Sequence, residues 1–288
     1  MGADGGATLW WIWPVALFAI SFAMGAVAVL AGVGGGVLFV PIVGAFFPFH
    51  PDFVRGAGLL LALTSALSAA PGLLRGGLAS LRLAMPAALV GSITSIVGAL
   101  IGLALPADAV YTALGVLILG IVVLMGRAGK AEPAGMTGGD RLGAALRMHG
   151  IYHDAALGRD IDWQAHRTPA GLVAFAGVGL LAGMFGMGAG WANVPVLNLL
   201  MGLPLKLSVG TSVFVLSVVD SSAAWIYLNR GAVLPMLVAP SIIGVMLGAR
   251  IGVRLLHVAS ATVVRRTVIT LLALAGARAL LKGLGIWS

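Results

Sequence analysis

The chain has no cysteine and few charged residues. It holds 0 Cys, 9% charged residues and 60% apolar residues, and its mean hydropathy is +1.09. Without cysteine there is no disulfide, thiolate nucleophile or Cys-ligated metal centre, and the redox compartment stays open. Soluble domains carry roughly 25% charge and 45 to 50% apolar residues. The composition therefore predicts an integral membrane protein.

Several functional motifs are also missing. The sequence has no HExxH, GxSxG or phosphate-loop GxxxxGK[ST] motif, which argues against an intramembrane hydrolase or an ATP-driven pump. We therefore expect no enzyme activity and no cofactor. The formal charge is +8, but Lys and Arg are scattered singly and form no basic stripe. This excludes nucleic acid as a partner and favours a topology signal.

Long apolar runs are what the chain does contain. Runs of about 20 residues, enough to cross a bilayer as helix, recur without strand-like alternation. They predict an all-α, polytopic helical membrane protein. We expect a first membrane repeat at 9–126, a central polar cytoplasmic loop at 127–168, and a second membrane repeat at 169–286. The expected helical segments are 10–31, 37–47, 55–75, 83–104, 110–126, 170–185, 191–202, 208–229, 234–256 and 262–284.

The two halves repeat one another at a shift of 154 positions. The string Gly32-Val33-Gly34-Gly35-Gly36 returns as Gly186-Met187-Gly188-Ala189-Gly190, and Pro41 returns as Pro195. The same shift carries Ser68-Ala69-Ala70 to Ser222-Ala223-Ala224. Internal repeats in a hydrophobic chain are typical of secondary transporters, whose halves surround a site near the bilayer midplane.

Basic residues in short loops predict the orientation of the halves. Lys and Arg are retained on the cytoplasmic side. With the central loop inside, the turn at 105–108 falls outside, and its counterpart near Arg265 falls inside. The halves are therefore expected to be inverted repeats with both termini outside. Arg230, on the predicted outer side, fits this topology poorly. The first segment has no basic region before it, so we expect it to be retained.

Each glycine string is expected to break a helix within the membrane. Glycine permits backbone conformations closed to other residues, and the helix after each break begins with unpaired N–H groups that attract anions. Two such ends would form a cradle for a small anion. The expected cradle residues are Gly34, Gly35, Gly36, Val37, Gly188, Ala189 and Gly190. The alternative is that Gly32 with Gly36, and Gly186 with Gly190, let continuous helices pack closely.

With these breaks, their prolines and the following Gly210-Thr211-Ser212, the duplicated chain resembles the TauE/SafE sulfite exporter family of membrane permeases. The resemblance covers nearly all of both halves. It implies movement of small sulfur-containing or carboxylate anions such as sulfite or organosulfonates. In the first half Gly56-Ala57-Gly58 stands where the second has Gly210-Thr211-Ser212, so hydroxyl donors are expected mainly from the second half.

Polar residues at the second break complete the predicted site. Asp220, inside a predicted span, is costly to bury and is a candidate to bind the coupling proton. Its alternative role is to hold two helices together. Trp191 and Asn193 directly follow the second break and can wall the site and donate to an oxyanion, or merely pack; Asn198 is a weaker candidate.

Hydroxyls and basic side chains give further candidates. The hydroxyl candidates are Ser65, Ser68, Thr211, Ser212 and Ser222, although hydroxyls within spans often bond back to their own helix. Arg75, Arg82, Arg230 and Arg250 lie near span ends, where arginines reach the headgroups or attract anions. His149 and His153 with Asp154 have helical metal-site spacing, but no third well-placed ligand accompanies them.

These features together predict a secondary transporter in the bacterial inner membrane. We expect it to move a small anion by alternating access between the two breaks, coupled to a proton or sodium gradient. The expected partners are the anionic substrate, the coupling ion and membrane lipid. Two alternatives stay open: a passive anion channel, and a membrane protein acting on an anionic lipid.

Overall fold

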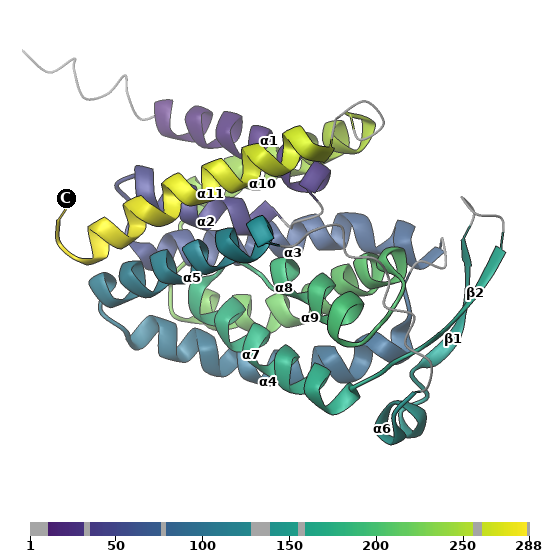
Figure 1. Ribbon diagram of the computed structural model, residues 1–288. Coiled ribbons are helices and arrows are strands. Elements are labelled where there is room, and N and C mark those ends of the chain that lie inside the picture. Colours follow the sequence, from purple (N-terminus) through teal and green to yellow (C-terminus); the bar gives the residue numbers. More distant parts are fainter. Residues whose placement is uncertain are drawn as a thin grey trace, which may run out of the picture.

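The structure is a computed structural model that describes residues 11–31, 35–75, 79–127, 139–154, 159–255 and 261–286. Its helices pack into one bundle, and a β-hairpin extends from one end (Figure 1). The first half contains α1 (Ile12–Ala31), α2 (Gly35–Phe46), α3 (Pro51–Arg75), α4 (Leu81–Ala104) and α5 (Ala107–Arg127). The second half contains α7 (Thr168–Phe185), α8 (Gly190–Pro195), the π-helical turn η1 (Val196–Leu200), α9 (Leu205–Asn229), α10 (Pro235–Leu255) and α11 (Ala261–Gly283). The prediction of an all-α polytopic membrane protein is confirmed.

Three helices are long and apolar enough to cross a membrane: 81–104, 168–185 and 207–229. Four shorter apolar helices accompany them. On α4, Met85, Leu89 and Ile93 are more than half exposed and stand four residues apart. Residues at this spacing share one helix face, so α4 presents an apolar stripe outward, as a helix in contact with lipid does.

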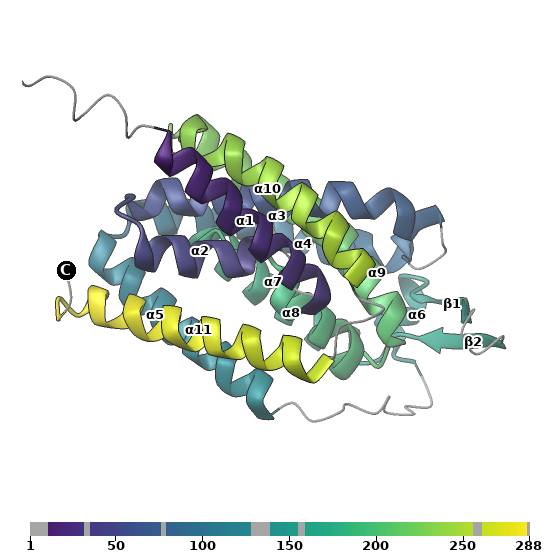
Figure 2. The ribbon, with the colours of Figure 1, turned by 90° about the horizontal axis from the view of Figure 1, so that it is seen from above.

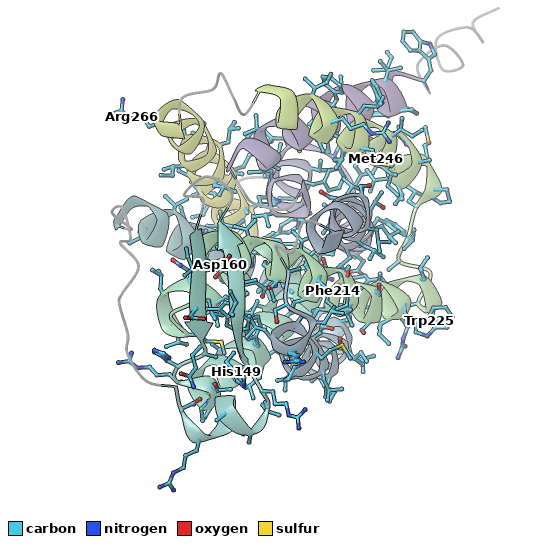
Figure 3. The ribbon with its side chains drawn as sticks, turned by 90° about the vertical axis from the view of Figure 1, so that its right-hand side faces the viewer. His149, Asp160, Phe214, Trp225, Met246 and Arg266 are labelled. Atoms are coloured by element: carbon cyan, nitrogen blue, oxygen red, sulfur yellow. The ribbon has the colours of Figure 1, made fainter. Side chains whose placement is uncertain are left out.

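The central polar segment contains structure that the sequence did not reveal. It forms α6 (Arg141–Ala145) and an antiparallel hairpin of β1 (His149–Asp154) and β2 (Arg159–Gln164). Figure 3 labels His149 and Asp160 on this hairpin. The helical spacing expected for His149 and His153 is therefore wrong, because both stand on a strand. No group of three or more His, Asp or Glu side chains that could hold a metal ion occurs among the described residues.

Asp140 ties this segment to the second membrane repeat. Its Oδ1 accepts hydrogen bonds from the Gly143 N–H at 2.8 Å and the Thr168 hydroxyl at 2.8 Å, and its Oδ2 accepts one from the Thr168 N–H at 2.7 Å. Desolvation alone would raise the pKa of Asp140, but these hydrogen bonds outweigh it and lower the pKa below its ordinary value. The carboxylate thus caps α6 and holds the start of α7 beside it.

In two helix pairs, the first helix of one half packs against a helix of the other half. The α1 helix packs on α10 of the other half, and α7 packs on α4 (Figure 2). In the first pair a methyl group added to Gly25 would lie 2.6 Å from the Val245 carbonyl oxygen, and in the second one added to Gly179 would lie 2.4 Å from the Gly91 carbonyl oxygen. Shifting Gly25 and Val245 by 154 positions, forward and backward, gives Gly179 and Gly91. The two contacts therefore occupy equivalent places in the repeat.

Two helices pack against their own counterparts and run antiparallel to them. Gly283 near the end of α11 lies against Thr112 near the start of α5, and Gly115 further along α5 lies against Leu280. Figure 2 shows these two helices side by side. The α3 helix pairs with α9 in the same way: Leu59 clusters with Tyr227, whereas Ala66, further along α3, clusters with the earlier residue Leu216.

Candidate functional site

The second glycine string interrupts a helix. The α7 helix ends at Phe185, Gly186 and Gly188 have φ angles of +68° and +75°, and α8 begins at Gly190. Positive φ values of this size strain any residue with a side chain, which is why glycine stands there. A continuous helix through this string, the alternative left open above, is wrong. In the first half α1 ends at Ala31 and α2 begins at Gly35; Gly34 lies outside the described residues.

The two interruptions meet inside the bundle. A methyl group added to Gly36 would lie 2.6 Å from the Gly58 carbonyl oxygen and 2.9 Å from the Met187 carbonyl oxygen. One added to Gly58 would lie 2.4 Å from the carbonyl oxygen of Gly186. We call the meeting of Gly36, Gly58, Gly186 and Gly188 the glycine crossing. Only residues without a side chain allow the backbones of α2, α3 and the second break to approach so closely.

The glycine crossing lies near the middle of α3. Ala62 contacts both sides of it, 3.0 Å from a methyl group on Gly36 and 2.9 Å from one on Gly188. It is 11 residues after Pro51 and 13 before Arg75. At about 1.5 Å per residue, either end of α3 is roughly 16 to 20 Å away. The first half supplies α2 to this region, and Gly35 to Ala45 of that helix are all buried except Ile42.

Asp220 lies beside the second break. It is fully buried on α9, and a methyl group on Gly188 would come 2.8 Å from its Oδ2. The backbone amide of Ala189 approaches this carboxyl group without the geometry of a full hydrogen bond. Neither carboxyl oxygen has a hydrogen-bond partner among the described residues. A buried polar group without a partner is costly, so this carboxyl group points to a binding role.

Two further polar side chains at this break are also unpartnered. Asn193 is fully buried, and both its amide nitrogen and its amide oxygen lack hydrogen-bond partners within the described chain. The same holds for the buried indole N–H of Trp191. Asn193 is held in place through its backbone N–H, which donates to the Ala189 carbonyl oxygen at 3.1 Å. The short helix after the break therefore carries unpartnered donors on Trp191 and Asn193, while Gly188 and Ala189 at the break itself adjoin the carboxyl group of Asp220.

The predicted cradle residues lie at the glycine crossing or next to it, some from α2 and some from the second break. Gly35, Gly36 and Val37 form the buried first turn of α2, while Gly188, Ala189 and Gly190 are buried at the second break. Asn198, the weaker candidate, lies in η1, and its amide donates to the Leu203 carbonyl oxygen at 2.7 Å. Its amide nitrogen thus holds the turn that follows the broken helix.

The predicted hydroxyls are not gathered at the crossing. Thr211 is buried but accepts a hydrogen bond from the Ser80 N–H at 3.2 Å, and it precedes Asp220 by nine residues, or about 13 Å of helix. Ser212 is its buried neighbour, and Ser65 is half-buried one turn beyond Ala62. The Ser68 and Ser222 hydroxyls donate to carbonyls four residues earlier, at 2.8 and 3.1 Å. Their part in binding stays a prediction.

Arg55 is a buried residue that sequence reasoning missed. It is 1% exposed, yet it stands at the fifth position of α3. Its Nη1 donates to the Gly102 carbonyl oxygen at 2.9 Å and the Met184 carbonyl oxygen at 3.0 Å, and its Nη2 pairs with Asp52. It thus holds the last turns of α4 and α7 against α3, directly before the second break. The Asp52–Arg55 spacing of three residues at a helix start was the available signal.

A pocket of about 280 Å³ opens next to this ion pair. It lies between the start of α3, the end of α4 and the turn after α9. Its lining consists of His50, Asp52, Phe53, Leu103, Arg230, Gly231 and Ala232. The other arginines named above also lie near helix ends: Arg75 closes α3, while Arg82 and Arg250 are exposed near an end of α4 and α10.

These features define a polytopic helical membrane protein with buried polar side chains beside the interruption between α7 and α8. The family model for the sulfite exporter TauE/SafE matches residues 17–279. The chain therefore belongs to the TauE/SafE sulfite exporter family, as the sequence resemblance indicated, and the family assignment describes a membrane anion exporter. No curated protein and no solved structure matches the chain.

Proposed function

We propose that this protein is a secondary transporter that carries a small oxyanion, sulfite or an organosulfonate, across the membrane by alternating access at the glycine crossing. The observation that carries the proposal is the set of unpartnered polar groups at and directly after the second break. Trp191 and Asn193 offer buried N–H donors that no other described group uses, and both oxygens of the buried Asp220 also lack a partner among the described residues. Donors of this kind stabilise an oxyanion that has lost its water.

Asp220 supplies a reason for coupling to protons. A carboxylate and an anion a few ångströms apart in a low-dielectric interior repel one another strongly. Binding of the anion beside Asp220 is therefore favoured when that carboxyl group holds a proton. One proton then moves with each anion, so a proton gradient drives the anion in the direction of proton flow. A sodium ion bound to this carboxylate would neutralise the same charge and is the alternative coupling ion.

The inverted-repeat architecture is part of the proposal. It is supported by α5 running antiparallel to its counterpart α11, and by α3 running antiparallel to α9. It is also supported by the equivalent exchanged contacts at Gly25 and Gly179. In transporters of this kind, one arrangement of the two repeats opens the site to one side of the membrane, and the mirrored arrangement opens it to the other. The location of the protein in the bacterial inner membrane stays a prediction of the sequence resemblance.

Transport in liposomes tests the proposal. Purified protein is reconstituted, and uptake of sulfite is measured across a range of concentrations with and without an imposed pH gradient. We expect uptake that saturates, that runs uphill when a proton gradient is applied, and that organosulfonates inhibit. Uptake that rises linearly and ignores the pH gradient would instead identify a passive channel. Inhibition by lipid phosphate but not by organosulfonates would identify a protein that acts on anionic lipid.

A further inference from the structure

The pocket beside Asp52 has one arginine and one acid in its lining. Arg230 is exposed and makes no ion pair with another described residue. His50, with a side chain 56% exposed, also lines the pocket, while Phe53, Leu103 and Ala232 supply apolar surface. Because one water molecule takes about 30 Å³, a pocket of about 280 Å³ has room for a small oxyanion with some of its water.

Asp52 stands between this pocket and Arg55: it lines the pocket, whereas Arg55 is 1% exposed and is not among the lining residues. Its Oδ1 pairs with Nη2 of Arg55, and its side chain is 27% exposed. The Nε of Arg55 is buried and has no hydrogen-bond partner among the described residues. Nε and Nη2 form one edge of the planar guanidinium, the edge on which an oxyanion binds through two parallel hydrogen bonds. Asp52 uses one donor of this edge and leaves the other unpaired.

A released Asp52 would stay at the mouth of the pocket, close to His50. The Nδ1 of His50 accepts a hydrogen bond from the Asp52 N–H at 3.4 Å and lies 3.5 Å from Oδ2, so it pairs with the carboxylate only when the imidazole is protonated. An anion that takes both donors of Arg55 therefore does not leave the carboxylate alone, since that carboxylate stays at the exposed mouth beside His50 and water. This exchange would replace the one hydrogen bond between Arg55 and Asp52 with two hydrogen bonds between Arg55 and the anion.

Arg55 also connects the pocket to the glycine crossing. Gly186 packs so tightly on it that a methyl group at Gly186 would lie 2.4 Å from the Arg55 carbonyl oxygen. Asp52 precedes Gly58, a member of the glycine crossing, by six residues, or about 9 Å of helix. Arg55 thus stands between Asp52 at the pocket and Gly58 and Gly186 at the crossing.

We propose that this pocket is a second anion-binding site, in which a small oxyanion displaces Asp52 from the Nε–Nη2 edge of Arg55 and is attracted there by Arg230. It is the site that the transported anion occupies before or after the glycine crossing, on the side predicted to lie outside. The assignment rests on the proposed function for its choice of ligand. It also accounts for Arg230, whose charge contradicts the usual placement of basic residues on the cytoplasmic side.

Equilibrium binding of sulfite to the purified full-length protein tests this site. Asp52→Asn removes the competing charge and should tighten binding by about tenfold, the value of roughly one charge-assisted hydrogen bond. Arg230→Gln should weaken binding several-fold, and combining it with Asp52→Asn should remove most of the gain. Arg250→Gln, an exposed arginine on α10, is the matched control and should bind like wild type. Thermal unfolding of each variant checks that it is folded.

The outcomes separate this site from the proposed function. Asp52→Asn protein that is folded but binds sulfite no more tightly than wild type would overturn the second site, as would an Arg230→Gln protein with unchanged affinity. Liposome flux by wild type decides the proposed function separately. If wild type shows saturable uphill flux but both variants bind sulfite like wild type, the proposed transport function is retained and only the second anion site is refuted. If wild type shows neither flux nor sulfite binding, the transport function and the second site are both refuted.

Discussion

Gly188 on the second break lies directly against the carboxyl group of Asp220 on α9. A methyl group at Gly188 would come 2.8 Å from Oδ2 of Asp220, and the φ angle of +75° at Gly188 itself favours glycine. The acid therefore faces backbone at the point where the helix is interrupted. Any movement of the second break changes what this carboxyl group contacts, which is how the proposed transport site would couple its conformation to a proton on Asp220.

Replacing Asp220 with Asn should abolish the pH dependence of transport. An amide cannot exchange the coupling proton, so a pH gradient no longer drives uptake. With one proton per anion, each pH unit contributes about 1.36 kcal/mol, or roughly tenfold in accumulation. That tenfold response should be lost in the variant. Asp108→Asn, an exposed acid at the start of α5, is the control and should keep it. An unchanged pH response in Asp220→Asn protein would falsify the coupling role.

Replacing Gly36 with leucine should eliminate transport. A leucine there collides with the carbonyl oxygens of Gly58 and Met187, both of which are backbone atoms that cannot rotate away. Overpacking of this kind costs about 1 to 3 kcal/mol, and the two breaks are forced apart. We expect membrane insertion to persist while sulfite uptake in liposomes falls to the protein-free level. Gly190, the counterpart of Gly36 in the repeat, should behave in the same way.

Gly177→Leu is the matched control for Gly36→Leu. Gly177 is exposed on α7, and a methyl group added there meets nothing within 4 Å. It should retain wild-type uptake. If Gly36→Leu protein also transports like wild type, the close contact between α2 and the second break is packing alone.

The helices and their breaks were predictable from the sequence because the cause is local. Apolar runs set the length of each span, and Gly186 and Gly188 interrupt the chain wherever it lies, since their own backbone freedom is what ends the helix. The position of Asp220 within a span marked it as unusual for the same reason. The place of Asn193 directly after the break suggested a binding role, but the sequence could not show that its amide lacks a hydrogen-bond partner.

Other parts of the structure depend on contacts between distant residues. Arg55 looks in sequence like an arginine near a helix start, and only the folding of α4 and α7 around it places the carbonyl oxygens of Gly102 and Met184 within reach of its Nη1. The hairpin at 149–164 was missed because its short strands carry polar residues between a few apolar ones. Thr211 was expected at the site with Asp220, but nine residues of helix separate the two.

Loss of Arg55 should destabilise the fold. In Arg55→Met protein, Asp52 loses its ion-pair partner, and two carbonyl groups lose their shared donor. Each hydrogen bond from a charged donor contributes about 1.5 to 3 kcal/mol, whereas Asp52, with a side chain 27% exposed, keeps water as a partner. Tyr227→Phe is the comparison: it removes one hydroxyl that donates to the Gly183 carbonyl oxygen at 3.0 Å, worth about 1 kcal/mol. Thermal unfolding in detergent should show the larger loss for Arg55→Met, and equal midpoints would contradict a holding role for Arg55.

Asp140 should stabilise the junction between the hairpin segment and α7 in a pH-dependent way. Its pKa is lowered, because hydrogen bonds from Thr168 and Gly143 to the carboxylate outweigh the desolvation that would raise it. A lowered pKa means that the stabilisation is present above the ordinary value of about 3.9. It is lost as the pH falls through the lowered value.

Asp140→Ala tests this junction directly. At pH 7 the variant loses the cap of α6, worth about 1 kcal/mol, and its thermal midpoint should fall, while Asp162→Ala, an exposed acid on β2, should match wild type. The difference between wild type and Asp140→Ala should stay constant from pH 8 to pH 5 and shrink below about pH 4, where the wild-type carboxylate takes up a proton. A difference that persists undiminished at the lowest pH would mean that Asp140 acts through packing and not through its charge.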